Sequence, residues 1–164
     1  MALEPAITDI EQLKDNPALA ALLAWKRDVV KEAKWDRDEM TVVVEREALR
    51  DVCAVLRDGP TKFMFLADLT CADWYPSEPR FHVVYHLLSF SRKERVRIKV
   101  KLHGTDPNVE SVTSLWPGAN LFEREVFDLF GIRFNGHPNL RRIMMPDDWD
   151  GHPLRKDYPV EGYR

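Results

Sequence analysis

Cysteine is scarce in this sequence, since only Cys53 and Cys71 occur among its 164 residues. Two thiols cannot supply the four ligands of a tetrathiolate zinc site or an iron–sulfur cluster. They do not make the framework of a disulfide-stabilised secreted domain either, so a reducing compartment is the simpler expectation. Cys53 falls inside an apolar helical stripe, and we expect it to be a small core residue.

Long apolar runs and a basic excess are also missing. No stretch approaches the roughly 18 consecutive apolar residues that span a bilayer. The first residues do not join a basic segment to an apolar core, so we expect no secretory signal. Lys and Arg number 24 against 27 Asp and Glu, which argues against a dedicated nucleic-acid binder. We expect the chain to meet a membrane only through partners.

Familiar catalytic motifs are absent from the sequence as well. It contains no glycine-rich dinucleotide or phosphate loop, no G-x-S-x-G and no H-E-x-x-H. Its hydrophobic fraction of 45% and charged fraction of 31% are those of an ordinary single soluble domain. The residues therefore predict a folded domain without a recognisable active site.

Hydrophobic periodicity predicts an α+β domain over residues 1–133. Residues 46–57 place Leu49, Val52, Cys53 and Leu56 on one helical face, and Gly59-Pro60 ends that helix. The other expected elements are a helix from Asn16-Pro17, a hairpin of strands 29–35 and 40–44, strands 62–70, 81–90 and 95–102, and a final helix over 120–130 followed by Gly131. This order predicts two layers, with helices on one mixed, mostly antiparallel sheet.

Residues 134–164 have a different character and predict an extended C-terminal tail. Four prolines interrupt any helical or strand period, namely Pro138, Pro146, Pro153 and Pro159. The segment also carries apolar residues such as Ile143, Met144, Trp149 and Leu154, which is too much apolar surface to leave in water. We expect this tail to lie extended against its own domain or another chain, and to pack on partner subunits.

The final helix contains charged residues with two competing interpretations. On a helical wheel Glu123 and Glu125 fall inside the apolar arc, while Arg124 and Asp128 share the polar face with the spacing to pair. The glutamates could be paired acids for general acid–base catalysis. The favoured interpretation is structural, because buried carboxylates must be paired or raise their pKa, and Arg141-Arg142 and Arg155-Lys156 follow as cations.

Two further patterns have alternative interpretations. The strand at 95–102 alternates Arg95, Arg97, Lys99 and Lys101 with apolar residues, which indicates a solvated face or, less favoured, a docking surface for an acidic partner. Residues 135–142 are echoed by residues 150–156, each copy having a turn dipeptide, His-Pro, Leu and two cations. A metal site using His137 and His152 with nearby aspartates is weakly supported, and recognition elements are favoured.

Residues 123–144 resemble the signature of the 30 kDa subunit family of respiratory complex I, whose bacterial members are the C-type subunits of the proton-translocating NADH–quinone oxidoreductase. The signature is E-R-E, two residues, an acid, two apolar residues, six residues, His, three residues, two basic residues and two apolar residues, and every position is met. Residues 146–159 also look like that family. The family's motif residues here are Glu123, Arg124, Glu125, Asp128, His137, Arg141, Arg142, Asp147, Asp148, Trp149, His152, Arg155 and Lys156.

The resemblance implies a non-redox structural subunit of the peripheral arm, in an enzyme that transfers electrons from NADH to quinone. It implies no catalytic centre and no cofactor in this chain, with FMN and iron–sulfur clusters held by partner subunits. The implied partners are other peripheral-arm subunits, especially the 49 kDa-type (D-type) subunit and the B-type subunit that holds the terminal cluster, on the cytoplasmic side of the bacterial plasma membrane. The resemblance also implies that the final helix is held to the tail by Glu123, Glu125, Arg141 and Arg142. The alternative is the equivalent subunit of a membrane-bound hydrogenase or another quinone-reducing complex.

Overall fold

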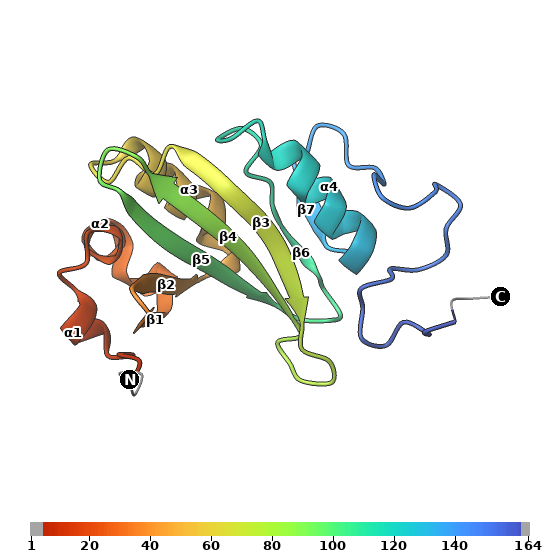
Figure 1. Ribbon diagram of the computed structural model, residues 1–164, viewed down its shortest axis with the longest axis horizontal. Coiled ribbons are helices and arrows are strands. Elements are labelled where there is room, and N and C mark those ends of the chain that lie inside the picture. Colours follow the sequence, from red (N-terminus) through yellow and green to blue (C-terminus); the bar gives the residue numbers. More distant parts are fainter. Residues whose placement is uncertain (1–4, 162–164) are drawn as a thin grey trace.

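The computed structural model describes residues 5–161, which form a mixed five-stranded sheet with helices packed on it (Figure 1). The strand order is β1-β2-β5-β4-β3. The strands are β1 Val30–Asp36, β2 Glu39–Val44, β3 Phe65–Asp73, β4 Phe81–Ser89 and β5 Glu94–Leu102. The β2–β5 pair is parallel and the other three neighbouring pairs are antiparallel. The predicted α+β fold with a mostly antiparallel sheet is confirmed.

Four α-helices accompany this sheet in the described part of the chain. They are α1 Ile10–Leu13, α2 Pro17–Lys26, α3 Leu49–Asp58 and α4 Ala119–Phe130, with 3-10 turns η1 Arg27–Val29 and η2 Arg46–Ala48. A small parallel pair joins β6 Asn108–Glu110 to β7 Arg133–Asn135. None of the helices within residues 5–161 has the length and apolar character needed to cross a bilayer.

The core lies between one face of the sheet and the helices α2, α3 and α4. Val96, Ile98 and Val100 of β5 point into it, as the alternation predicted, and their neighbours Arg97 and Lys99 point to the other face. Cys53 of α3 is fully buried there, which confirms the prediction of a core cysteine. Burial raises the pKa of its thiol.

The β1–β2 hairpin shows how local sequence sets the sheet. Arg37 and Asp38 occupy the two-residue turn with φ of 52° and 61°. Two successive positive φ angles characterise the type I′ turn, whose twist matches that of the strands it joins. The predicted hairpin is therefore confirmed, with β1 ending one residue later than expected.

Some predicted boundaries were wrong. The strand expected at 62–70 begins at Phe65, because Thr61 and Phe63 hydrogen-bond back to the carbonyl of Leu56 and hold the chain against α3. It continues to Asp73 because β4 pairs with it along its full length. The helix expected from Arg46 starts with a 3-10 turn. The elements α1, β6 and β7 were not predicted, and β7 keeps Phe134 in the core rather than in the tail.

Candidate functional site

The candidate site is helix α4 with the tail that follows β7, and Asp128 is its centre. The Asp128 side chain is 0% exposed. One carboxylate oxygen accepts a hydrogen bond from Arg142 at 2.7 Å, and the other accepts the backbone N–H groups of residues 143, 144 and 145 at 2.7–3.0 Å. Burial acts to raise the pKa of Asp128, but these donors outweigh it and lower that pKa. A single ionised carboxylate therefore holds one turn of the tail against the helix.

The predicted pairing within α4 was wrong, because the tail covers the face that the wheel assigned to solvent. Asp128 pairs with Arg142 of the tail, while the guanidinium of Arg124 donates to the backbone carbonyls of Arg141 and Arg142 at 3.1 and 3.0 Å. The guanidinium of Arg142 also donates to the carbonyls of Trp149 and Gly151, both at 3.0 Å. Arg142 thus joins two turns of the tail to the helix.

The end of α4 is capped by the tail. Helix C-termini leave carbonyl groups without helical partners. Here the carbonyl of Asp128 faces Nδ1 of His152 at 2.8 Å, the carbonyl of Leu129 accepts the N–H of Leu154 at 3.0 Å, and that of Phe130 accepts Nε of Arg155 at 2.6 Å. Gly131 follows with φ of 73°, which confirms it as the C′ residue. The cation of Arg155 also suits the negative end of the helix dipole.

The two histidines of the repeated turns lie at opposite ends of α4. His137 contacts the carbonyl of Asn120 at 3.2 Å and His152 contacts that of Asp128 at 2.8 Å. These carbonyls are eight positions apart along the helix, a rise of roughly 12 Å. Within residues 5–161 there is also no group of three or more metal-ligating side chains. The interpretation of His137 and His152 as metal ligands is therefore wrong.

Glu123 and Glu125 point in different directions. Glu123 is 0% exposed, and its carboxylate accepts hydrogen bonds from Ser111 Oγ at 2.6 Å and from the Val112 N–H at 2.7 Å. Burial raises the pKa of Glu123 to about 7 although these donors oppose the shift. Glu125 is exposed. The acid–base pair is therefore not formed. Glu125 is not buried as we expected, and Glu123 has no ion pair with any of residues 5–161.

The remaining motif residues lie on the outer side of the tail. Arg141, Asp147, Asp148, Trp149 and Lys156 are exposed. Asp148 and Asp147 have no hydrogen bond or ion pair with the described part of the chain. The structure thus separates the motif into residues that fasten α4 to the tail, around Asp128, and residues that face outwards.

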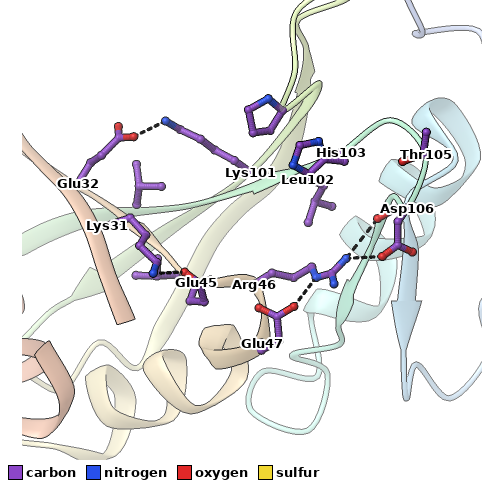
Figure 2. Close-up of a pocket in the computed structure, with 13 residues that line it drawn as sticks. Lys31, Glu32, Glu45, Arg46, Glu47, Lys101, Leu102, His103, Thr105 and Asp106 are labelled. Atoms are coloured by element: carbon purple, nitrogen blue, oxygen red, sulfur yellow. Dashed lines mark hydrogen bonds and ion pairs between the residues drawn. The ribbon is translucent and has the colours of Figure 1, made fainter. Parts of the chain in front are cut away.

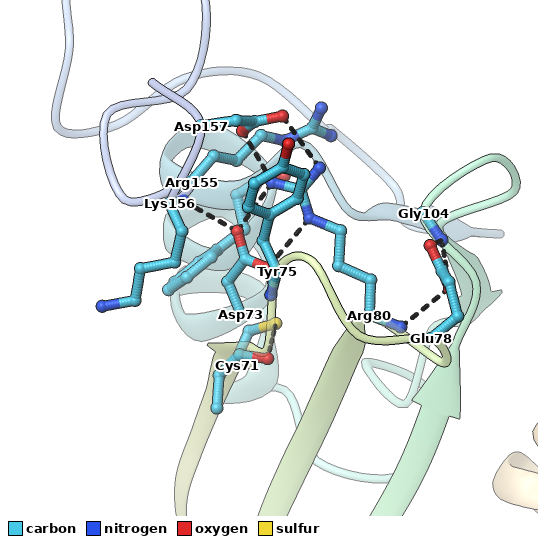
Figure 3. A network of polar contacts seen from close by, with 11 residues as sticks. Cys71, Asp73, Tyr75, Glu78, Arg80, Gly104, Arg155, Lys156 and Asp157 are labelled. Atoms are coloured by element: carbon cyan, nitrogen blue, oxygen red, sulfur yellow. Dashed lines mark hydrogen bonds and ion pairs between the residues drawn. The ribbon is translucent and has the colours of Figure 1, made fainter. Parts of the chain in front are cut away.

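Arg80 makes a second attachment of the tail that sequence reasoning missed (Figure 3). Its guanidinium donates to both carboxylate oxygens of Asp73, at 2.9 and 2.7 Å, and to both of Asp157, at 2.9 and 2.6 Å. Asp73 also accepts the N–H of Lys156 at 2.8 Å. Burial acts to raise the pKa of Asp73, but Arg80 and the backbone donors lower it to about 2. No sequence signal marks this site, since its members are 7 and 77 residues apart.

Replacing Asp157 with asparagine should loosen the tail end without unfolding the domain. We expect the free energy of unfolding to fall by under about 1 kcal/mol, because Asp157 is partly exposed and Asp73 still neutralises Arg80. The backbone amides of residues 154–158 should exchange hydrogen several-fold faster, as timed mass spectrometry would show. Asp147→Asn is the matched control. Equal exchange of this segment in both variants would show that Arg80 does not anchor the tail.

A cleft of about 620 Å³ lies beside the end of β5, between Lys31 and Glu45 on one side and Pro79 and His103 on the other (Figure 2). Its charged side chains already have partners: Lys31 pairs with Glu45 at 2.6 Å, and Arg46 pairs with Asp106 at 2.7 Å and Glu47 at 2.9 Å. Lys101 likewise reaches Glu32. These mutual pairs leave the cleft with little unsatisfied charge to bind a ligand, so α4 and the tail remain the candidate site.

Known proteins resemble this chain over most of its length. Residues 42–164 match the family described as "Respiratory-chain NADH dehydrogenase, 30 Kd subunit". The C-type subunit of the NADH-quinone oxidoreductase of Roseiflexus castenholzii is 50% identical over 148 residues, which cover 89% of this chain and 85% of the relative.

Two solved structures share the fold. The trypsin-resistant fragment of Nqo5 has a TM-score of 0.58 and 39% identity, covering 62% of this chain and 83% of the fragment. A chain of the membrane-bound sulfane sulfur reductase, an archaeal respiratory membrane complex, has a TM-score of 0.73 at 23% identity, covering 90% of this chain and 86% of that one. The second likeness concerns the fold alone. The family match covers residues 42–164, the Roseiflexus castenholzii relative is 50% identical, and the motif residues gather on α4 and the tail. The chain therefore belongs to the 30 kDa subunit family of the respiratory-chain NADH dehydrogenase.

Proposed function

We propose that the chain is the C-type subunit of a proton-translocating NADH–quinone oxidoreductase and a non-redox structural part of its peripheral arm. Electrons would pass from NADH through FMN and iron–sulfur clusters to quinone within partner subunits, on the cytoplasmic side of the plasma membrane. The name of the 50% identical relative supports this assignment over a hydrogenase-type complex. The two buried cysteines are also too few to ligate a cluster on their own.

The observation that carries the structural role is the apolar outer surface of α4 and the tail. Large apolar side chains are exposed there although the backbone beneath them is firmly held: Leu121, Ile143, Met144, Trp149 and Leu154. Met144 is 62% exposed while its N–H is bonded to Asp128. Ordered apolar surface of this kind marks a protein–protein interface.

The tail in Figure 1 runs around the side of α4 that faces away from the sheet. Its polar groups are turned inwards, to Asp128 and to the carbonyls at the helix end, so its apolar groups are left for a partner. Exposed Asp147, Asp148 and Arg141 would form the polar rim of that contact. We assign this surface to the 49 kDa-type subunit and to the subunit that holds the terminal cluster.

The double variant Met144→Ser, Trp149→Ser tests this assignment. It removes apolar contact area without changing the charge or the Asp128 bonds, so the isolated chain should melt as the parent does. Buried Trp and neighbouring anchors commonly contribute about 1–3 kcal/mol each to an interface, so assembly should fall about tenfold or more. The amount of assembled complex in membranes and its NADH–quinone activity per complex are the measurements.

The matched control is Trp25→Ser, Met64→Ser, which removes an exposed Trp and an exposed Met elsewhere on the chain. It should leave the amount of complex unchanged. If the Met144, Trp149 variant assembled normally but reduced no quinone, the surface would have a role in the reaction and the structural assignment would be wrong. A flavin or iron–sulfur spectrum in the chain expressed alone would contradict the non-redox assignment as well.

A further inference from the structure

The sheet has a second face that α2, α3 and α4 leave uncovered, with the short helix α1 at its edge. We call it the open face. It is the side opposite the core, and α2, α3 and α4 lie on the core side. Strand register places its residues in rows across the sheet. They include Asp68 and Thr70 of β3, His82, Val84 and His86 of β4, Arg95, Arg97, Lys99 and Lys101 of β5, Glu39, Thr41 and Val43 of β2, and Glu32 and Lys34 of β1.

Lys99 is a cation of the open face whose ammonium group has no ion-pair partner in the described part of the chain. Its neighbours Arg97 and Lys101 pair with Glu39 and Glu32, the latter seen in Figure 2. The ammonium group of Lys99 makes no hydrogen bond or ion pair within residues 5–161. Burial first, and then the cations Arg97, Lys34 and Lys101, lower the pKa of its ammonium group. An approaching anion would thus meet a partly desolvated charge that repels its present neighbours.

A groove of about 400 Å³ surrounds this ammonium group. Ile10, Val43 and Trp74 form apolar parts of its wall. The Trp74 ring packs against His82 with centroids 5.4 Å apart and is 55% exposed. The groove therefore combines apolar walls, a large aromatic ring and one unpaired cation, which together suit an acidic side chain flanked by apolar ones.

Carboxylates on the same face restrict which anion can bind. Glu32, Glu39 and Asp68 lie around the cations. A nucleic acid or an anionic membrane presents many charges and needs a clear basic excess, and these carboxylates offset most of the positive charge of the face. A single carboxylate on a protein segment can reach Lys99 with only Glu32 of these three carboxylates lining the same groove, and Lys101 already neutralises Glu32. Charge complementarity therefore favours a protein partner.

We propose that the open face, centred on Lys99, Val43 and Trp74, is a second docking surface that takes an acidic segment of another subunit. This docking proposal rests on the proposed function, because it requires that the chain works inside an assembly. The surface lies across the sheet from α4 and the tail, so both surfaces can be occupied at once. The chain then bridges two neighbours rather than lying at the edge of the assembly.

Zero-length coupling with a carbodiimide in the purified complex tests this proposal, because the reagent joins an amine only to a carboxylate in contact with it. We expect a peptide containing Lys99 to be joined to an Asp or Glu of another subunit. Lys99→Arg should lose this product yet assemble normally. Lys99→Glu should lower the amount of assembled complex about tenfold, whereas Lys26→Glu, the same change on α2, should not.

Two kinds of result would contradict the docking proposal for the open face. Coupling of Lys99 only to Glu32 of its own chain, or to a second copy of this chain, would overturn the proposal. So would acetylation of Lys99 by an N-hydroxysuccinimide ester at the same rate in the complex as in the isolated chain. Because the complex used already contains the chain, a reactive Lys99 counts against the open face alone and leaves the proposed function standing.

Discussion

Replacing Asp128 with alanine is expected to lower the free energy of unfolding by about 3–5 kcal/mol and to release the tail from α4. The change leaves the guanidinium of Arg142, which is largely buried, without its carboxylate. It also leaves three backbone N–H groups of residues 143–145 without an acceptor. Urea denaturation followed by linear extrapolation measures the loss.

Two comparisons make the Asp128 result specific. Asp128→Asn keeps one acceptor oxygen but no charge, so we expect its free energy of unfolding to lie between those of the parent and of Asp128→Ala. Asp51→Ala removes an exposed carboxylate from α3 and should change stability by under about 0.5 kcal/mol. Trypsin should also cleave after Arg141 and Arg142 much faster in Asp128→Ala. A loss as small as that of Asp51→Ala would show that the tail is held by other contacts.

The Glu123→Gln variant is expected to be more stable than the parent at pH 8, by about 3 kcal/mol. The folded-state pKa of Glu123 is raised from 4.5 to about 7, so the folded protein binds the proton more tightly than the unfolded chain. The parent therefore loses stability as the pH rises from about 4.5 to 7 and keeps that lower value above pH 7. Glutamine imitates the protonated carboxyl and removes this loss.

The variant and the parent should be equally stable near pH 4, where Glu123 is protonated in both folded and unfolded states. Urea denaturation at pH 4 and pH 8 gives the two differences directly. Glu125→Gln is the control, because Glu125 is exposed and two residues away on the same helix. If Glu123→Gln were less stable than the parent at pH 8, the bonds from Ser111 and Val112 to the ionised carboxylate would outweigh the effect of burial.

Elements whose residues are close in sequence could be predicted, because their periodicity or turn chemistry is local. The alternation of basic and apolar residues in β5 predicted which residues face the core. The apolar stripe of α3 predicted its buried side, and Gly131 predicted where α4 ends. The parallel pairing of β2 with β5 could not be predicted from local sequence, because the paired residues lie more than 50 positions apart. Strand order depends on such distant contacts, which no short pattern encodes.

The candidate site was predicted as a region but not as a set of contacts. A helical wheel assumes that one side of a helix faces the core and the other faces water. On α4 the tail covers part of the second side, so Asp128 is buried on the face predicted to be polar, and Glu125 is exposed on the face predicted to be apolar. Arg80 was missed because its two carboxylates come from β3 and from the tail.

The capping of α4 has a consequence for how the tail meets its neighbour. Within one chain, Asp128 already holds residues 142–145 of the tail on the helix, and the carbonyl groups at the helix end hold residues 152–155. The conformational entropy of ordering this segment is therefore lost when the chain folds, not when it associates. Docking then proceeds as contact between preformed surfaces, so the rate of assembly should depend on encounter and orientation rather than on folding of the tail at the partner.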